Sequence, residues 1–170
     1  MTPRPALHVH AADARPWLRQ QSGARFDAIS VDAYRQPYIP FYLTTREFFS
    51  EVRDHLSPRG VVLVNVGHPS SSERLEKVLS ATMGTAFRTV LRDPVRSTNT
   101  VLLGTNTDAS RASMHIATRA MPPDLAGVTA AAADRLAPAL RGGSVYTDDR
   151  APVEWLIDAS IVKVAADGER

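Results

Sequence analysis

Residues 26–45, FDAISVDAYRQPYIPFYLTT, decide the fold that we predict for this chain. The first six of them are apolar and partly β-branched, which predicts a short strand that ends at an acid, Asp32. A loop that contains Pro37 and Pro40 follows the acid, and a helix begins after the loop. Open α/β sheets bind their ligands at the carboxyl ends of parallel strands, so Asp32 is a candidate functional residue. The alternative is a turn-forming aspartate in a connection that the prolines stiffen.

The segments that follow alternate between helix and strand patterns. An apolar stripe predicts a helix over residues 45–56, and VVLVNV (residues 61–66) is apolar enough for a strand buried on both faces. A second helix is predicted over residues 71–83, followed by an antiparallel hairpin of residues 86–91 and 98–104. Together these segments predict an α/β fold, a sheet that is mostly parallel with an antiparallel C-terminal hairpin.

The segment before the opening strand offers two further candidate sites. Residues 6–11 alternate loosely, which predicts a strand with His8 and His10 on one face. Two histidines at this spacing can bind a metal ion, but no third ligand lies nearby in the sequence, so exposed strand histidines are the favoured interpretation. Asp13 then begins a helix over residues 14–20, where its carboxylate can accept a backbone N–H and meet the helix dipole.

The last third of the chain is rich in alanine, arginine and proline. Residues 107–139 predict two helices that are broken at Pro122 and Pro123. The segment VYTDDRAPVEWLID follows, and it contains the neighbouring acids Asp148 and Asp149. These acids are either a metal-binding pair or an acid-rich turn before a short helix, and the turn is the favoured interpretation.

Composition bounds the class of protein. The chain has 170 residues, 44% of them hydrophobic, and a net charge of +2 from 20 basic and 18 acidic residues, so we expect one α/β domain over residues 1–170. Within it, residues 1–105 form the core and residues 106–170 a helical extension. The basic residues are scattered, which argues against a nucleic-acid surface. The absence of cysteine excludes disulfides and thiolate chemistry, and the absence of a signal sequence or of a membrane-length apolar run leads us to expect a cytoplasmic protein.

Three of these segments resemble the spermidine synthase-like family of polyamine aminopropyltransferases, in the order that the family has them. AADARPWL resembles its acidic motif before a short helix, VDAYRQPYIPFYLTTREFF its strand and substrate loop, and TDDRAPVEWL a segment near its C-terminus that closes over the site. The resemblance implies a Rossmann-like sheet of the methyltransferase type. It also implies a transferase of polyamine biosynthesis that moves an aminopropyl group from decarboxylated S-adenosylmethionine to an amine.

The resemblance assigns the nucleoside to the first motif. Asp13 is similar to the aspartate that accepts a hydrogen bond from the adenine amino group, and the backbone N–H of Ala14 at the helix start can donate to a ring nitrogen. The nucleoside is a co-substrate, decarboxylated S-adenosylmethionine or S-adenosylmethionine, and we expect no permanently bound cofactor and no metal ion.

The resemblance assigns the acceptor amine to the second motif. Asp32 stands where the family's catalytic aspartate removes or orients the amine proton, and Tyr34, Arg35 and Gln36 belong to the loop over the substrate. The family usually has a second aspartate at the position of Arg35, and a guanidinium repels a cationic polyamine. An S-adenosylmethionine-dependent methyltransferase is therefore the alternative activity.

The family's Gly-rich loop and its first two strands have no counterpart in this sequence, because Met1 lies just before what resembles the third strand. About half of the nucleoside site is thus expected to be absent, and we expect the isolated chain to be inactive. Either residues 6–11 pair directly with residues 26–31, or a strand edge stays open for a homodimer or for a complementing polypeptide. A non-catalytic remnant, a dimerisation module and a gene product that starts upstream of Met1 are the remaining interpretations.

Overall fold

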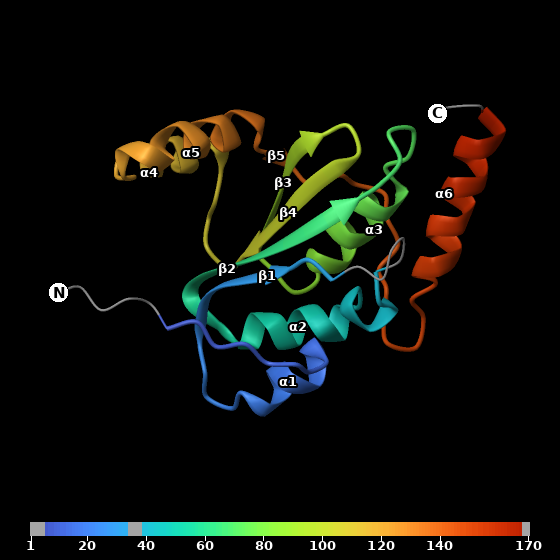
Figure 1. Cartoon of the computed structure of the whole chain (residues 1–170), viewed down its shortest axis with the longest axis horizontal. Helices are drawn as coiled ribbons and strands as arrows, with labels where there is room; N and C mark the ends of the chain where they lie inside the picture. Colours follow the sequence, from blue (N-terminus) through green and yellow to red (C-terminus); the bar gives the residue numbers. More distant parts are fainter. Residues whose placement is uncertain (1–5, 34–38, 168–170) are drawn as a thin grey trace.

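The computed structural model describes residues 6–33 and 39–167 as an open five-stranded sheet with helices packed against it (Figure 1). The strands stand in the order β1-β2-β4-β3-β5. Their bounds are β1 Phe26–Val31, β2 Leu56–Gly67, β3 Thr89–Arg96, β4 Asn99–Thr105 and β5 Ala137–Pro138. This order confirms the α/β class and the antiparallel hairpin, which β3 and β4 form.

The expectation of a mostly parallel sheet is wrong. β1 and β2 are parallel, whereas the other three pairs of neighbouring strands in the described sheet are antiparallel. The reason is that the returning strand of the hairpin, β4, inserts beside β2 and reverses the direction there. β3 also runs further than the predicted strand, because Asp93 and Pro94 lie inside β3 and not in the turn of the hairpin.

The helices follow the predicted order with small shifts of their ends. They are α1 Ala14–Gln20, α2 Arg46–Asp54, α3 Arg74–Met83, α4 Arg111–Thr118, α5 Pro123–Arg135 and α6 Val153–Asp167, with the 3-10 turn η1 Phe41–Leu43 before α2. In Figure 1, α1 and α2 lie below the sheet, and α4 and α5 form a hairpin near β3. None of the helices that the structure describes combines the length and the apolar character that crossing a bilayer requires.

The main core lies between one face of the sheet and the helices α2 and α3. Side chains alternate along a strand, so Val62, Val64 and Val66 of β2 point to the same face, and all three are buried. They meet fully buried side chains of the two helices, Phe49 and Val52 of α2 and Leu79 and Met83 of α3. This packing fixes β1 and β2, and Asp32 lies at the carboxyl end of β1.

The opposite face of the sheet is largely uncovered. We call it the open sheet face; strand register assigns to it Ala28 and Ser30 of β1, Val61 and Leu63 of β2, and Val101 and Leu103 of β4. Ala28 and Ser30 are exposed, the four larger residues are only partly buried, and none of the six belongs to the main core. The helix α5 covers this side near β3, where Arg135 binds Asp93, the register partner of Val101.

Residues 6–11 do not form the predicted strand. They run along the surface without sheet pairing, and Leu7 and Val9 are 87% and 84% exposed. Alternation alone does not make a strand, because a strand also needs a hydrogen-bonded neighbour and a face to bury. The two histidines of this segment are exposed, and no group of three or more metal-ligating side chains occurs among the residues described.

We predict that Gly104→Ala destabilises the protein by about 1–3 kcal/mol, because the added Cβ would overpack the main core. It would lie 2.8 Å from Phe87 and 2.9 Å from Val62. Gly127→Ala in α5 is the matched control, since its Cβ meets no atom within 4 Å and alanine favours helices. Urea denaturation of both variants measures the difference, and equal stabilities would contradict this account of the core.

Candidate functional site

Asp13 caps α1, as the sequence predicts. Its Oδ1 accepts a hydrogen bond from the backbone N–H of Arg15 at 3.2 Å, and the hydroxyl of Tyr42 donates to its Oδ2 at 2.8 Å. Both oxygens are thereby held in place, yet each carboxylate oxygen can accept a further hydrogen bond. The side chain is exposed, and Ala14 begins the helix beside it, where backbone N–H groups have no partner within the helix. A fixed anion next to the backbone N–H of Ala14 suits a ligand that both donates and accepts.

An open cleft lies beside this carboxylate. It has an empty volume of about 690 Å³ and is lined by Asp13, Arg15, Pro16, Arg19, Phe41, Tyr42 and Asp148. Phe41 is 47% exposed, and its ring meets the ring of Tyr42 edge-on at 5.6 Å. An exposed aromatic ring beside a carboxylate offers stacking and hydrogen bonding to a planar base. Sequence reasoning did not single out Phe41 and Tyr42, although both lie in the stretch that decides the fold.

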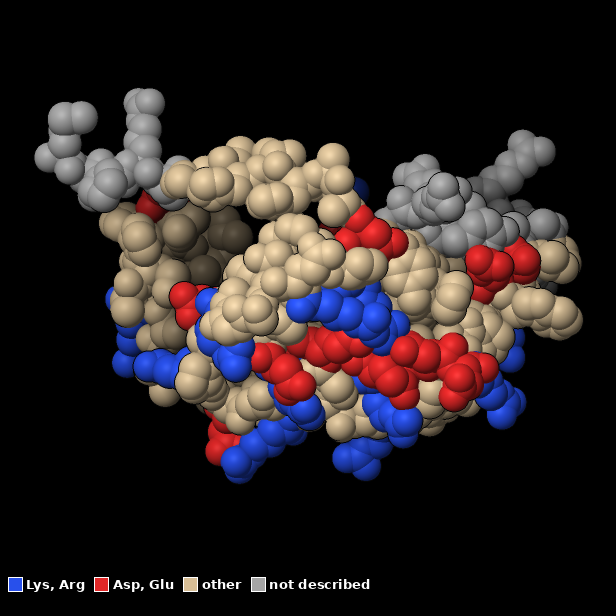
Figure 2. All heavy atoms as spheres, turned by 90° about the horizontal axis from the view of Figure 1, so that it is seen from below, with Lys and Arg blue, Asp and Glu red and all other residues tan. Residues whose placement is uncertain are grey.

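The guanidinium of Arg15 holds this region together from beneath. The side chain is buried, and its nitrogens bind both carboxylate oxygens of Asp148 at 2.8 Å, Glu51 at 2.8 Å and the carbonyl of Tyr42 at 3.1 Å. Asp148 also accepts from the hydroxyl of Thr45 at 2.6 Å. One buried cation therefore joins α1, η1, α2 and the turn at residues 147–150, and Figure 2 shows the band of opposite charges across the face of α1 and α2.

This network decides the role of the neighbouring acids Asp148 and Asp149. Asp148 accepts hydrogen bonds from Arg15 and Thr45, and the backbone of Thr147 pairs with that of Arg150 in a tight turn. Asp149 is exposed. The structure thus agrees with the acid-rich turn, and it adds an anchoring role for Asp148 that the sequence did not reveal.

The ion pairs shift the acidity of the groups in the network. Hydrogen bonds from Arg15 lower the pKa of Asp148, against the opposing effect of burial. For Glu51, burial alone would raise the pKa, but the hydrogen bonds from Arg15 and Arg19 outweigh it and the pKa is lowered. The same bonds to Asp148 and Glu51 raise the pKa of Arg15 above its usual range. All three groups are therefore charged at neutral pH.

Asp32 lies at the carboxyl end of β1, where the sequence places it. Its carboxylate is exposed and accepts a hydrogen bond at 2.9 Å from the side-chain amide of Asn65. Asn65 follows Val64, which is the register partner of Val31 on the parallel strand β2. The bond orients the carboxylate at the edge where open α/β sheets bind ligands. Tyr34, Arg35 and Gln36, the predicted substrate-binding residues, lie outside the described residues.

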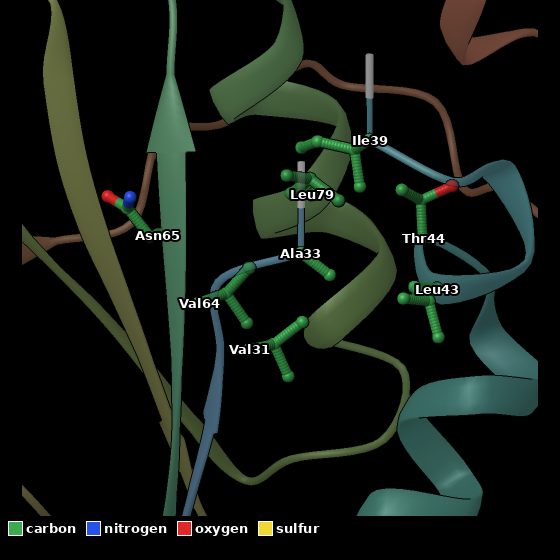
Figure 3. A pocket seen from close by; sticks show the side chains of 8 residues that line it. All are labelled: Val31, Ala33, Ile39, Leu43, Thr44, Val64, Asn65 and Leu79. Atoms are coloured by element: carbon green, nitrogen blue, oxygen red, sulfur yellow. The ribbon is translucent and has the colours of Figure 1, made fainter. Parts of the chain in front are cut away.

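A small apolar pocket opens next to Asp32 (Figure 3). It has room for about one water molecule and is lined by Val31, Ala33, Ile39, Leu43, Thr44, Val64, Asn65 and Leu79. In Figure 3, Asn65 lies on the other side of the β2 ribbon from Thr44 and Leu79. Asn65 therefore points toward the open sheet face and orients Asp32 from that side.

The structure does not bring Asp13 and Asp32 into one pocket. The cleft at Asp13 and the pocket next to Asp32 share no lining residue, and η1 runs between them. Phe41 and Tyr42 of this turn line the cleft, whereas Leu43 lines the pocket. Within the described part of the chain, the two predicted acids thus occupy two separate positions.

Comparison with curated proteins finds two relatives of one kind. The chain is 32% identical, over 95% of its length, to a probable polyamine aminopropyl transferase of Bifidobacterium longum, of which it covers 40%. It is 35% identical, over 56% of its length, to a polyamine aminopropyltransferase of Vibrio vulnificus, of which it covers 32%. No family model matches the chain. The chain thus spans less than half the length of these relatives.

Comparison with solved structures agrees. A probable spermidine synthase from Corynebacterium glutamicum aligns with a TM-score of 0.54 and 26% identity, over 79% of this chain and 54% of that one. Human methyltransferase-like protein 13, solved in complex with SAH, aligns with a TM-score of 0.51 and 19% identity, over 75% of this chain and 58% of that one. The second likeness concerns the fold alone, and it confirms the methyltransferase-type sheet.

We predict that Asp148→Asn lowers the free energy of unfolding by about 1–2 kcal/mol. The buried guanidinium of Arg15 would lose one of its two anionic partners, although the 42% exposure of the Asp148 side chain moderates the loss. Asp149→Asn, one residue further along the turn, is the control and should leave stability unchanged. Urea denaturation at pH 7 tests both variants, and equal effects would argue against the anchoring role.

We also predict that acid weakens the same network. The folded-state pKa values of Glu51 and Asp148 are lowered, so both groups stabilise the fold above their ordinary pKa values of 4.5 and 3.8. This stabilisation is lost as the pH falls through the lowered values. The free energy of unfolding should therefore fall as the pH drops from about 5 toward 3, and the Asp148→Asn variant should show a smaller fall. An identical pH profile for the two proteins would contradict the prediction.

Proposed function

This chain is spermidine synthase-like in sequence and fold, and from that premise we propose that it forms the nucleoside-binding and acceptor part of an aminopropyl-transfer site. The donor is decarboxylated S-adenosylmethionine and the acceptor is an amine. The amine nitrogen forms a bond to the aminopropyl carbon, the carbon–sulfur bond breaks, and methylthioadenosine leaves. The amine must lose a proton in the process, so the site needs a nucleoside pocket and a base.

The position of Asp13 carries this proposal. Its carboxylate is fixed by Tyr42 and by the start of α1, and it faces a cleft with an exposed aromatic ring, Phe41. An adenine fits this arrangement chemically, because its amino group can donate to the carboxylate while its ring stacks on Phe41. The backbone N–H of Ala14 at the helix start can donate to a ring nitrogen. Arg15 and Arg19 contribute no free positive charge to the cleft, since Glu51 and Asp148 bind them.

Asp32 is the proposed base or orienting group for the amine. It is an exposed carboxylate at the carboxyl end of β1, and the hydrogen bond from Asn65 leaves it free to accept another. A carboxylate in this position attracts a cationic amine and can receive the proton that the amine gives up. In this proposal Tyr34, Arg35 and Gln36 contribute to acceptor binding, and the charge of Arg35 disfavours a polyamine with ammonium groups close to it.

The described residues alone do not complete such a site. Asp13 and Asp32 line no common pocket. The match covers only 40% of the Bifidobacterium longum protein, so most of that relative lies outside it. We propose that the remainder of the nucleoside site comes from further polypeptide, either a complementing segment or a second copy. The isolated chain is therefore expected to bind the nucleoside without transferring the aminopropyl group. Methyl transfer gains no support of its own from the fold, which both kinds of enzyme share.

Titration calorimetry with methylthioadenosine, the nucleoside product, tests the proposal. We expect micromolar binding to the wild-type chain and a loss of about tenfold or more with Asp13→Ala, because a hydrogen bond to a charged group is removed. Tyr42→Phe should weaken binding less, since it frees the carboxylate but keeps the ring. Asp149→Ala removes an exposed acid elsewhere and serves as the control. Absence of binding by the folded wild type, or equal binding by Asp13→Ala, would refute the nucleoside role.

A further inference from the structure

The helix α6 is apolar on two opposite faces. Its inner face packs on the main core through Val153, which is fully buried, and through Leu156 and Ile157, which are partly buried. Its outer face carries two large apolar side chains that are strongly exposed, Trp155 at 83% and Val162 at 67%. A helix at the surface of a protein usually has one apolar face, which is buried, and a polar face opposite to it. The second apolar face of α6 is therefore a candidate contact surface.

Four described residues make up this outer face, Trp155, Ala159, Val162 and Ala166, and all four are exposed. We call them the outer stripe. Their spacing is that of the a and d positions of a coiled coil, so they form one narrow strip along the helix. In Figure 1, α6 stands at the margin of the molecule, and among the described elements it contacts mainly α3. The outer stripe is thus accessible to a second helix.

A second copy of α6, antiparallel to the first, complements the outer stripe. A two-fold axis midway between Ala159 and Val162 places Ala159 opposite the partner's Val162. The same axis places Trp155 opposite the partner's Ala166, because both pairs have the same midpoint along the helix. Each large side chain then meets a small one, which is the self-complementarity that a two-fold interface requires. A parallel pair would instead set tryptophan against tryptophan and alanine against alanine.

Electrostatics favours the same antiparallel arrangement. The dipoles of two antiparallel helices oppose each other, and the C-terminal end of the partner's helix comes to lie beside the segment that leads into α6. That segment contains Arg150, whose side chain is exposed. The last carbonyl groups of a helix carry partial negative charge, so a cation next to them is stabilising.

We propose that the outer stripe of α6 joins two copies of this chain through an antiparallel, two-fold helix contact. This inference goes beyond the proposed function, because it needs no nucleoside and uses neither Asp13 nor Asp32. The second copy is the occupant to which both the size pattern and the charge pattern point.

The area of the contact indicates a weak and reversible dimer. A large aromatic side chain buries roughly 150–250 Å² when it is covered. Two copies of Trp155, with the smaller residues of both stripes, therefore remain below the roughly 1,200 Å² at which stable interfaces begin. We expect dimerisation in the micromolar range and not a permanent dimer.

Sedimentation velocity over a series of protein concentrations tests the pairing. We expect a reversible dimer that Val162→Glu weakens at least tenfold, because the carboxylate would face the partner's Ala159 across an apolar contact. Val128→Glu in α5 is the matched control, since Val128 is 69% exposed and Val162 is 67% exposed, and it should leave dimerisation unchanged. Circular dichroism checks that both variants fold.

Cysteine cross-linking tests the register, because the chain has no cysteine of its own. We expect a mixture of the Trp155→Cys and Ala166→Cys variants to form a disulfide-linked dimer on mild oxidation. Each variant alone should give at least tenfold less, since either position lies about 16 Å along the helix from its own symmetry mate.

Three results would overturn the proposal. They are a chain that stays monomeric at millimolar concentration, equal effects of Val162→Glu and Val128→Glu on dimerisation, and cross-linking of Trp155→Cys to itself, which would show parallel pairing. Methylthioadenosine binding is measured separately. A dimer that behaves as expected would stand even if the nucleoside did not bind, and loss of the dimer would leave the nucleoside role intact.

Discussion

The buried guanidinium of Arg15 is the interaction on which the candidate site depends. A cation removed from water is stable only with close anionic partners, and here Glu51 and Asp148 supply them from positions 36 and 133 residues further along the chain. The same group binds the carbonyl of Tyr42, and the hydroxyl of that tyrosine holds Asp13. The carboxylate at the cleft is thus positioned through a short chain of contacts that begins at one charge. Its geometry is therefore a property of the whole α1–α2–turn assembly and not of the acidic motif by itself.

The sequence predicted those features that local chemistry determines. β1 and α1 have the bounds that their patterns indicate, Asp13 caps α1, and Asp32 lies at the end of its strand. The partners of Arg15 could not be predicted, because they lie 36 and 133 residues away and no local pattern marks them. The strand expected at residues 6–11 failed for a related reason, since alternation says nothing about whether a neighbouring strand is present. The open sheet face likewise became visible only from the strand register.

The two acids that the resemblance singled out are positioned by different contacts. Asp13 depends on the charge network beneath α1, and Asp32 on a single amide from β2. Phe41 and Tyr42 line the cleft at Asp13, whereas Leu43 lines the apolar pocket at the end of β1. The helices described here cover one side of the parallel pair, and the carboxylate of Asp32 lies next to the uncovered side.

The long separation between Arg15 and Asp148 also has a consequence for the order of folding. α1 is synthesised more than a hundred residues before Asp148, so its buried cation acquires its second anionic partner only when residue 148 has left the ribosome. Until then Arg15 has only Glu51, which it shares with Arg19, and a guanidinium with too little negative charge around it favours water over the protein interior. The first motif of the chain is therefore among the last parts to reach its final geometry. Contacts of this span also raise the contact order and slow folding, so the cleft would mature after the sheet has formed.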